Sequence, residues 1–310
     1  LLWNWRMFLL TGEGRYTDML ETVAYNSLLA GVSLDGDGYF YTNPLAVSED
    51  VSHNYRWSKT REPYISYCNC CPPNTIRTVA EISNYVYSLS DEGLWVNLYG
   101  ANRLETTLRY GAALEVLQET DYPWAGEIRL RLAETPPGDF SVFLRIPAWS
   151  RKQTITINGE EIAPPIEAGT YHEIRRKWKA GDEILLNLGM EPFLVESHPL
   201  VEENQNLVAV QMGPVVYCLE SADLPEGIRP SDVLMPVRGS LDPVPVAIGK
   251  QRMLGLETEA RVRQGDAREH ALYQRLEDHP LETAKIRLIP YYAWGNREAG
   301  DMSVWLPVQW

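Results

Sequence analysis

A stretch of four residues holds three of the sequence's four cysteines, Cys68, Cys70 and Cys71, directly before Pro72 and Pro73. Adjacent cysteines rarely form a disulfide with each other, because the ring that would close is strained. Clustered, unbridged thiols in a chain with so few cysteines indicate metal binding or catalysis in a reducing compartment, and thiolate ligands favour zinc. These cysteines are therefore the first candidates for chemistry.

The two prolines predict a helix that begins at the cysteines, because proline is well placed in the first turn of a helix. Unpaired N–H groups and the positive end of the helix dipole stabilise an anion there, which favours a thiolate. A tetrahedral zinc ion needs four ligands, and this segment offers two or three, so it predicts an incomplete zinc site. On spacing alone, three buried structural cysteines, or a zinc ion that only ties loop to helix, explain the cluster equally well.

The surrounding elements divide into a helical part and a strand-rich part. Apolar residues recur at helical spacing up to about residue 90, and Leu2, Trp3, Met7 and Leu10 form the stripe of the first helix. We expect helices over 1–11, 16–30 and 72–86, a tight turn over 35–38, a short strand over 39–41 and a long polar loop over 46–66.

From Leu94 onward the apolar period changes to two, which is typical of strands with one buried face. Asn158-Gly159 predicts a two-residue hairpin turn. Strands at this spacing without intervening helices predict a β-sandwich. A second β-rich section is expected over 205–310, interrupted by a proline-rich connection over 222–246, and Cys218 is expected to be a small buried residue on a strand.

Composition excludes several partners. A net charge of −14 argues against nucleic acid, because phosphate binding depends on clustered lysine and arginine. No apolar run approaches the ~18 residues that a membrane-spanning helix needs, so no membrane partner is expected. With 45% hydrophobic and 23% charged residues, the sequence is typical of a globular protein with a neutral partner.

Residues 68–74, Cys-Asn-Cys-Cys-Pro-Pro-Asn, followed by Arg77, resemble the signature of glycoside hydrolase family 127, whose characterised activity is β-L-arabinofuranosidase. Further segments match that family in order along the chain: 3–7, 25–26, 31–36, 43–45, 213–220 and 289–294. The resemblance implies a multi-domain protein, α then β. Residues 1–92 would be the C-terminal helices of an (α/α)6 catalytic barrel, 93–200 a β-sandwich domain, and 201–310 a second β-rich section packing with both.

The resemblance also implies the chemistry. A zinc ion would be held by Cys70, Cys71 and a Glu-x-Cys pair that family members carry just upstream of the segment matching Leu1. Cys70 would be the nucleophile, forming a thioglycosyl intermediate and retaining configuration. The family's acid/base glutamate also precedes that segment, and Glu81, ~16 Å along a helix from Cys70, is too far away to replace it. We therefore expect a piece of a longer enzyme, poor in zinc binding and inactive by itself.

Three residues near the cysteines are candidates for substrate binding: Tyr41, Asn43 and Trp57. Loops often carry binding groups, although packing explains these side chains as well. Arg61 lies on the same loop as Trp57 and is a further candidate to approach the substrate. The expected partner is an oligosaccharide or glycopeptide, the clustered thiols favour the cytoplasm, and a homodimer is compatible with the sequence.

Two other functions stay open from the sequence. The sandwich and its tryptophans, Trp124, Trp149, Trp178 and Trp294, are compatible with a non-catalytic carbohydrate-binding module, although core packing explains each of them. The cysteine cluster is compatible with a structural zinc-thiolate protein.

Overall fold

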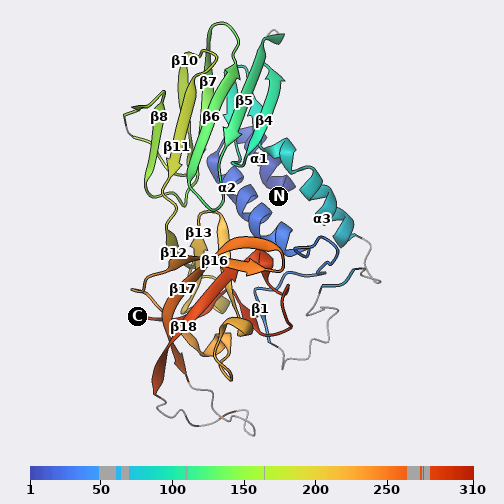
Figure 1. The fold of residues 1–310 in the computed structure, drawn as a ribbon, viewed down its shortest axis with the longest axis vertical. Coiled ribbons are helices and arrows are strands. Elements are labelled where there is room, and N and C mark those ends of the chain that lie inside the picture. The colour runs from blue at the N-terminus through green and yellow to red at the C-terminus, as the bar shows by residue number, and fades with distance from the viewer. Residues whose placement is uncertain are drawn as a thin grey trace. The chain divides into compact units, whose positions relative to one another are not determined.

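The computed structural model of the chain describes residues 1–48, 61–63, 70–108, 111–163, 165–263, 273, 275 and 280–310. The described residues group into two compact units, and each takes residues from two separate parts of the sequence (Figure 1). Unit 1 contains Leu1–Tyr25 and Ile76–Glu191, and unit 2 contains Asn26–Thr75 and Pro192–Trp310. The predicted domains 1–92, 93–200 and 201–310 stay a prediction.

Two sheets with a common core form most of unit 1, and they are the β-sandwich that the period of two predicts. Buried residues alternate along the strands, as with Ile128, Leu130 and Leu132. The smaller sheet has the order β10 (Thr170–Lys177), β7 (Asp139–Ile146), β3 (Gly93–Val96), β2 (Tyr87–Leu89). The larger sheet has the order β4 (Asn102–Thr107), β5 (Ala113–Glu119), β6 (Glu127–Glu134), β11 (Glu183–Leu188), β8 (Gln153–Ile157), β9 (Glu160–Glu161).

The predicted hairpin turn at Asn158-Gly159 joins β8 to β9, with Ile157 paired to Glu160. Asn158 and Gly159 have φ angles of 54° and 84°. Positive φ at both central residues is what a two-residue hairpin turn of this type requires, which explains the preference for Asn-Gly. The local sequence therefore fixes this connection.

Short helical segments complete the two units. The helix predicted over 16–30 is an α-helix that continues as a π-helix, η1, and Asn26 within the π-turn holds a hairpin of unit 2. Its Nδ2 donates to the carbonyl of Pro214 (2.9 Å), and its Oδ1 accepts from the N–H of Val216 (2.8 Å). The helices are α1 (Leu2–Thr11), α2 (Gly14–Thr22), η1 (Val23–Leu28), α3 (Cys71–Ala80), η2 (Ile82–Tyr85), η4 (Glu202–Asn204), η5 (Ser221–Asp223), η6 (Pro230–Asp232) and η7 (Tyr291–Ala293).

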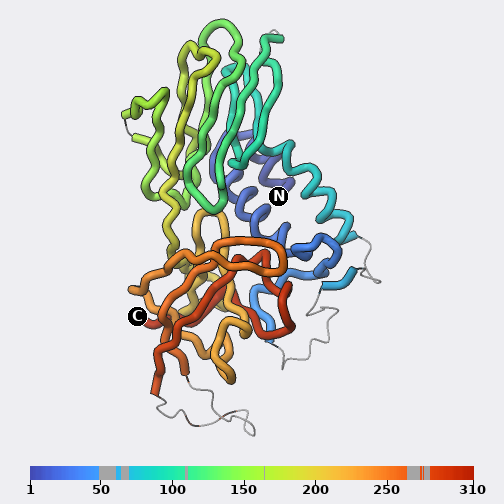
Figure 2. Tube along the Cα trace, viewed as in Figure 1, coloured from blue at the N-terminus to red at the C-terminus, as the bar shows by residue number. Residues whose placement is uncertain are grey.

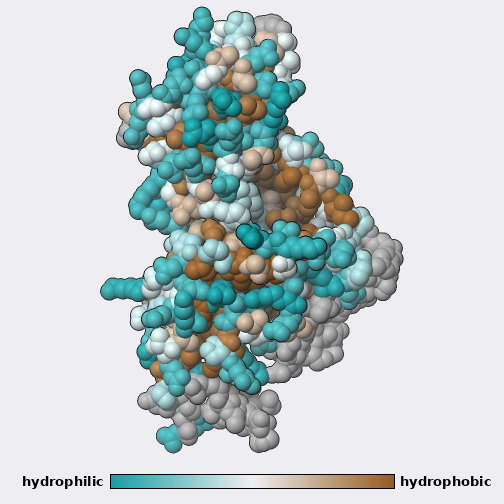
Figure 3. All heavy atoms as spheres, in the orientation of Figure 1, coloured by the Kyte–Doolittle hydropathy of each residue, from teal (hydrophilic) through white to brown (hydrophobic). Residues whose placement is uncertain are grey.

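The apolar stripe expected on the first helix is not a core face in the described part of the chain. Trp3 and Leu10 are 65% and 80% exposed, whereas Phe8 is the buried residue of α1. Phe8 lies within unit 1 against Tyr171 of β10, with 5.4 Å between the ring centroids, so α1 packs through a different face. Figure 3 shows apolar atoms gathered over α1 and α3 on the surface. None of the described helices is long and apolar enough to cross a membrane.

Six strands of unit 2 close into a ring, a barrel-like sheet rather than a second sandwich. The ring runs β13 (Leu207–Met212), β14 (Val215–Glu220), β18 (Leu281–Pro290), β17 (Gln251–Arg263), β15 (Val233–Pro236), β20 (Leu306–Gln309) and back to β13. Four further strands extend it: β12 (Pro192–Glu196) on β13, β16 (Asp242–Ile248) on β17, and β19 (Met302–Ser303) with β1 (Ala46–Val47) beyond β14.

The connection expected over 222–246 is wrong in part, because β15 and most of β16 lie within it. Its prolines suggested irregular structure. Pro243 and Pro245, however, lie on β16, which among the described strands pairs with β17 alone. An edge strand tolerates proline, because the N–H groups on its outer side need no partner in the ladder.

The early residues of unit 2 lie beside its last residues, as the blue and red parts of the tube show (Figure 2). β1 pairs with β19, and the Tyr291 hydroxyl donates to the carbonyl of Pro44 (3.0 Å). The short strand expected over 39–41 is reduced to bridges that join Tyr39 to Val32 and to Glu62. Much of the segment predicted as a long loop lies outside the described residues.

A buried arginine ties α2 to the sandwich within unit 1. Arg145 of β7 has no exposed surface and pairs with Asp18 (2.6 Å) and Glu21 of α2. Its Nε also donates to the carbonyl of Asn97 (2.5 Å), and the Tyr122 hydroxyl donates to Glu21 (2.7 Å). Burying a charge is costly unless every group around it is paired, and here both carboxylates and the guanidinium are.

Replacing Arg145 with methionine should destabilise the protein by about 3–5 kcal/mol, because the buried Glu21 and the half-buried Asp18 would lose their cation. The measurement is chemical denaturation of the chain. Arg103→Met is the matched control, since Arg103 pairs with Glu105 (2.9 Å) and Glu115 (2.9 Å) on the surface. It should cost less than about 1 kcal/mol. Equal losses in the two variants would contradict this account of the Arg145 cluster.

Candidate functional site

The cysteine pair lies at the beginning of α3, where the sequence predicts a helix start. The carbonyl of Cys70 accepts the N–H of Asn74 (3.0 Å), so Cys70 caps the helix and Cys71 is its first residue. The Cys70 side chain is exposed and that of Cys71 is half-buried. Their sulfur atoms lie 3.7 Å apart, so both point to one side of the helix start.

This separation tests whether the pair fits a metal ion. Two sulfurs bound to one tetrahedral zinc ion at ~2.3 Å lie ~3.8 Å apart. The observed 3.7 Å between the Cys70 and Cys71 sulfurs matches that value, so the pair fits two corners of a zinc site. Within the described residues, no three His, Cys, Asp or Glu side chains gather at one point, so the other two corners are not supplied there.

The first turn of α3 has few backbone donors. Pro72 and Pro73 have no N–H group, and the N–H of Asn74 is used by Cys70. An anion at this helix end is therefore stabilised mainly by the helix dipole and less by direct N–H contacts than in an ordinary helix. A cation between the two sulfurs would supply the charge that the missing donors do not.

The predicted substrate-binding residues have different environments. The Asn43 amide donates to the carbonyl of Ser27 (2.8 Å), and its Oδ1 is shielded and has no partner among the described residues. Tyr41 is half-buried. Trp57 lies outside the described residues. A role of these side chains in substrate binding stays a prediction.

The structure places Arg61, a candidate to approach the substrate, against backbone carbonyls. Its guanidinium donates to the backbone carbonyls of Trp294 (2.5 Å), Ala30 (3.0 Å) and Tyr292 (3.5 Å) within unit 2, and it lies over the ring of Phe40. Burial lowers the pKa of Arg61 to about 10, although Glu220 nearby opposes the shift. The sequence could not show this role, because the three carbonyls are up to 233 residues away along the chain.

Three family models match the chain in succession. Residues 1–84 match "Beta-L-arabinofuranosidase, GH127 catalytic domain". Residues 93–190 match "Beta-L-arabinofuranosidase, GH127 middle domain", and residues 192–307 match "Glycoside hydrolase family 127 C-terminal domain". The middle match covers the sandwich except β2, and the last one covers the closed ring of unit 2 up to the middle of β20.

Individual proteins match over nearly the whole chain. A non-reducing end β-L-arabinofuranosidase of Bifidobacterium longum subsp. longum is 32% identical over an alignment of 325 positions, and the match covers 96% of this chain and 46% of the relative. A solved structure described as a glycoside hydrolase is 46% identical with a TM-score of 0.95, and the match covers 100% of this chain and 51% of the other.

A solved β-L-arabinofuranosidase from Geobacillus stearothermophilus T6 is 36% identical with a TM-score of 0.90, over 99% of this chain and 48% of that one. The chain thus spans about half the length of the relatives it matches. These relatives are all described as glycoside hydrolases or as β-L-arabinofuranosidases, which are enzymes of that class. Within that class the chain belongs to glycoside hydrolase family 127, as its cysteine signature predicts.

Alkylation of the native chain should distinguish the described cysteines. Cys70 should react with iodoacetamide, whereas Cys218 should be protected, because it is fully buried on β14 and burial raises the pKa of its thiol. Peptide mass spectrometry with and without denaturant measures both rates. Native labelling of Cys218 at a rate similar to that of Cys70 would show that this prediction is wrong.

Proposed function

We propose that this chain provides the nucleophile and two zinc ligands of a retaining β-L-arabinofuranosidase. The observation that carries the proposal is the sulfur pair of Cys70 and Cys71 at 3.7 Å on the first turn of α3. The named activity of the Bifidobacterium relative supports release of a terminal β-L-arabinofuranosyl group from the non-reducing end of an oligosaccharide or glycopeptide.

The exposed Cys70 thiolate attacks the anomeric carbon of the terminal sugar, and a carbon–sulfur bond replaces the carbon–oxygen bond to the aglycone. A carboxylic acid protonates the departing oxygen. Water then attacks the same carbon, the carboxylate takes its proton, and the sulfur leaves. Two inversions give net retention of configuration. Bound zinc, held by Cys70 and Cys71, would keep the thiols deprotonated.

Cys70 and Cys71 fill only half of such a site. We propose that the remaining ligands, a glutamate and a cysteine, and the acid/base glutamate belong to the part of the family fold that this chain does not cover. The apolar faces of α1 and α3 support this, because Leu9 and Val79 are 58% and 40% exposed, as expected for helices of a larger (α/α)6 barrel. The chain alone is then inactive.

Other observations support parts of the proposal. The clustering of Cys70 and Cys71 favours action in a reducing compartment, such as the cytoplasm. Tyr41 and Asn43 are proposed to approach the sugar. A non-catalytic carbohydrate module is less well supported, because Trp178 and Trp294 are each 2% exposed and cannot offer a ring face to a sugar. Whether two copies of the protein pair stays a prediction.

In the complete enzyme that contains this sequence, Cys70→Ser should reduce hydrolysis of an aryl β-L-arabinofuranoside by at least about 10³-fold, because the nucleophile is removed. NMR of the first-formed sugar should show retention in the native enzyme. Cys218→Ala is the control, because this cysteine is buried on β14 and not exposed at the start of α3, and the variant should keep near-native activity. Full activity of the Cys70 variant would sink the nucleophile assignment.

The chain alone should bind zinc at least about 100-fold more weakly than the complete enzyme, because it offers two of four ligands. Competition with a chromophoric chelator measures both affinities. Replacing Cys71 with alanine should weaken binding further in each protein, because one of the two sulfurs is lost. Equal affinities of the chain and the complete enzyme would contradict the division of ligands.

A further inference from the structure

The Arg61 side chain joins three segments of unit 2 that are far apart in sequence. One Nη donates to the carbonyl of Trp294 (2.5 Å), and the other donates to the carbonyl of Ala30 (3.0 Å). The guanidinium carbon lies 4.3 Å from the centre of the Phe40 ring, and Phe40 stacks on the indole of Trp294 with 4.4 Å between centroids. Arg61 is therefore clamped between the turn at Ala30 and the turn at Trp294.

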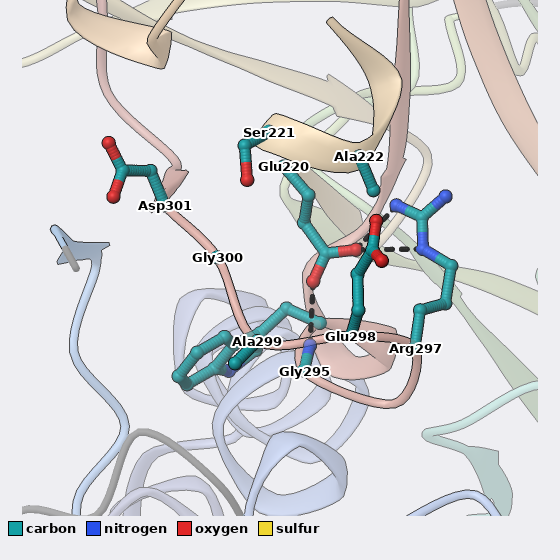
Figure 4. A pocket seen from close by; sticks show the side chains of 10 residues that line it. Glu220, Ser221, Ala222, Gly295, Arg297, Glu298, Ala299, Gly300 and Asp301 are labelled. Atoms are coloured by element: carbon teal, nitrogen blue, oxygen red, sulfur yellow. Dashed lines mark hydrogen bonds and ion pairs between the residues drawn. The ribbon is translucent and has the colours of Figure 1, made fainter. Parts of the chain in front are cut away.

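The turn at Trp294 is itself fixed from its other side. Glu220 accepts the N–H of Gly295 (2.7 Å) and pairs with Arg297, as the dashed lines in Figure 4 show. Gly295 has a φ of +64°, and a Cβ there would lie 3.1 Å from the Phe40 ring and 3.4 Å from Arg61 Nη1. Glycine thus permits the left-handed turn and the close approach of Arg61.

The turn at Ala30 reaches the cysteine helix. Gly31 follows Ala30 and lies close to Thr75 of α3, four residues after Cys71. A Cβ on Gly31 would reach van der Waals distance of Thr75 Oγ1 (3.4 Å) and would crowd the carbonyl of Leu28 (3.2 Å). The position of the Ala30–Gly31 turn therefore bears on the N-terminal part of α3.

Burial of the Arg61 guanidinium costs free energy that an apolar side chain would not cost. The hydrogen-bond partners of Arg61 are neutral carbonyls, and its Nε is buried without a partner among the described residues. An apolar side chain of similar volume would pack there without desolvating a charge. What only arginine offers is a rigid fork that sets the distance between two carbonyls.

We propose that Arg61 is a positioning residue for the cysteine pair: its guanidinium fixes the Ala30–Gly31 turn, on which the first turn of α3 rests. It acts on the reaction without touching the substrate. The inference rests on the proposed function, because positioning matters for catalysis only if Cys70 is the nucleophile.

Hydrogen exchange in this chain tests the positioning directly. Arg61→Met should raise amide exchange in residues 71–76 by at least about 10-fold, because their support is loosened. Arg61→Lys should not rescue it, because an ammonium group lacks the planar fork. Gly31→Val disturbs the same contact from the other end and should give the same pattern. If exchange in residues 71–76 stays native in Arg61→Met and Gly31→Val, the proposal is overturned.

Val233→Ala is the matched control, because it makes a cavity at a fully buried position of β15 in the same unit. Compared at equal loss of melting temperature, it should leave exchange in residues 71–76 unchanged. An equal rise there in Val233→Ala would reduce Arg61 to a general structural role and overturn the proposal.

Kinetics of the complete enzyme give the second readout. Arg61→Met should lower kcat by roughly 10- to 100-fold with KM changed less than about 3-fold, because the nucleophile is displaced while most substrate contacts remain. Native kcat in this variant, in an enzyme that Cys70→Ser inactivates, overturns the inference alone. Activity that survives Cys70→Ser overturns the proposed function instead, and the exchange data still decide whether Arg61 positions α3.

Discussion

Pro72 and Pro73 remove two backbone donors from the first turn of α3, directly after the cysteines that begin it. The turn is well suited to start a helix, because the prolines fix its φ angles. It can make few hydrogen bonds to neighbouring segments, because those bonds come from the unpaired N–H groups of a first turn. The position of the sulfur pair therefore depends on neighbouring segments, and the turn at Gly31, close to Thr75, is one of them.

Two arginines, Arg145 and Arg61, hold neighbouring segments of the chain in place in different ways. Arg145 in unit 1 neutralises Asp18 and Glu21, so the opposite charges lie next to each other. Without Arg145, the desolvation of the two carboxylates would no longer be compensated. Arg61 in unit 2 binds carbonyl groups, and the negative charge of Glu220 favours its charged form. The first arrangement serves stability. The second lowers stability but fixes the distance between two turns. Such an arrangement is expected near a functional site, where the positions of side chains must be fixed.

Local sequence signals predicted the elements whose cause is local. Asn158-Gly159 has the backbone that its hairpin needs, and the prolines mark the start of α3. The closed ring of unit 2 has no such signal, because β13 pairs with β20 nearly a hundred residues later. The environment of Arg61 was missed for the same reason. Its loop suggested a substrate contact, while its partners Trp294 and Tyr292 lie in a turn near the end of the sequence.

The Cys70 side chain is exposed, so other groups of a complete site would have to shield it from water. A thiolate open to water is solvated, and desolvation is what makes charge interactions in a site strong. Two sulfurs at 3.7 Å match one edge of a tetrahedron, so they define where the other ligands would have to lie but enclose nothing themselves. Groups that complete the tetrahedron would also cover Cys70. Metal binding and exclusion of water are thus one structural requirement here, and the pair of sulfurs alone meets neither part of it.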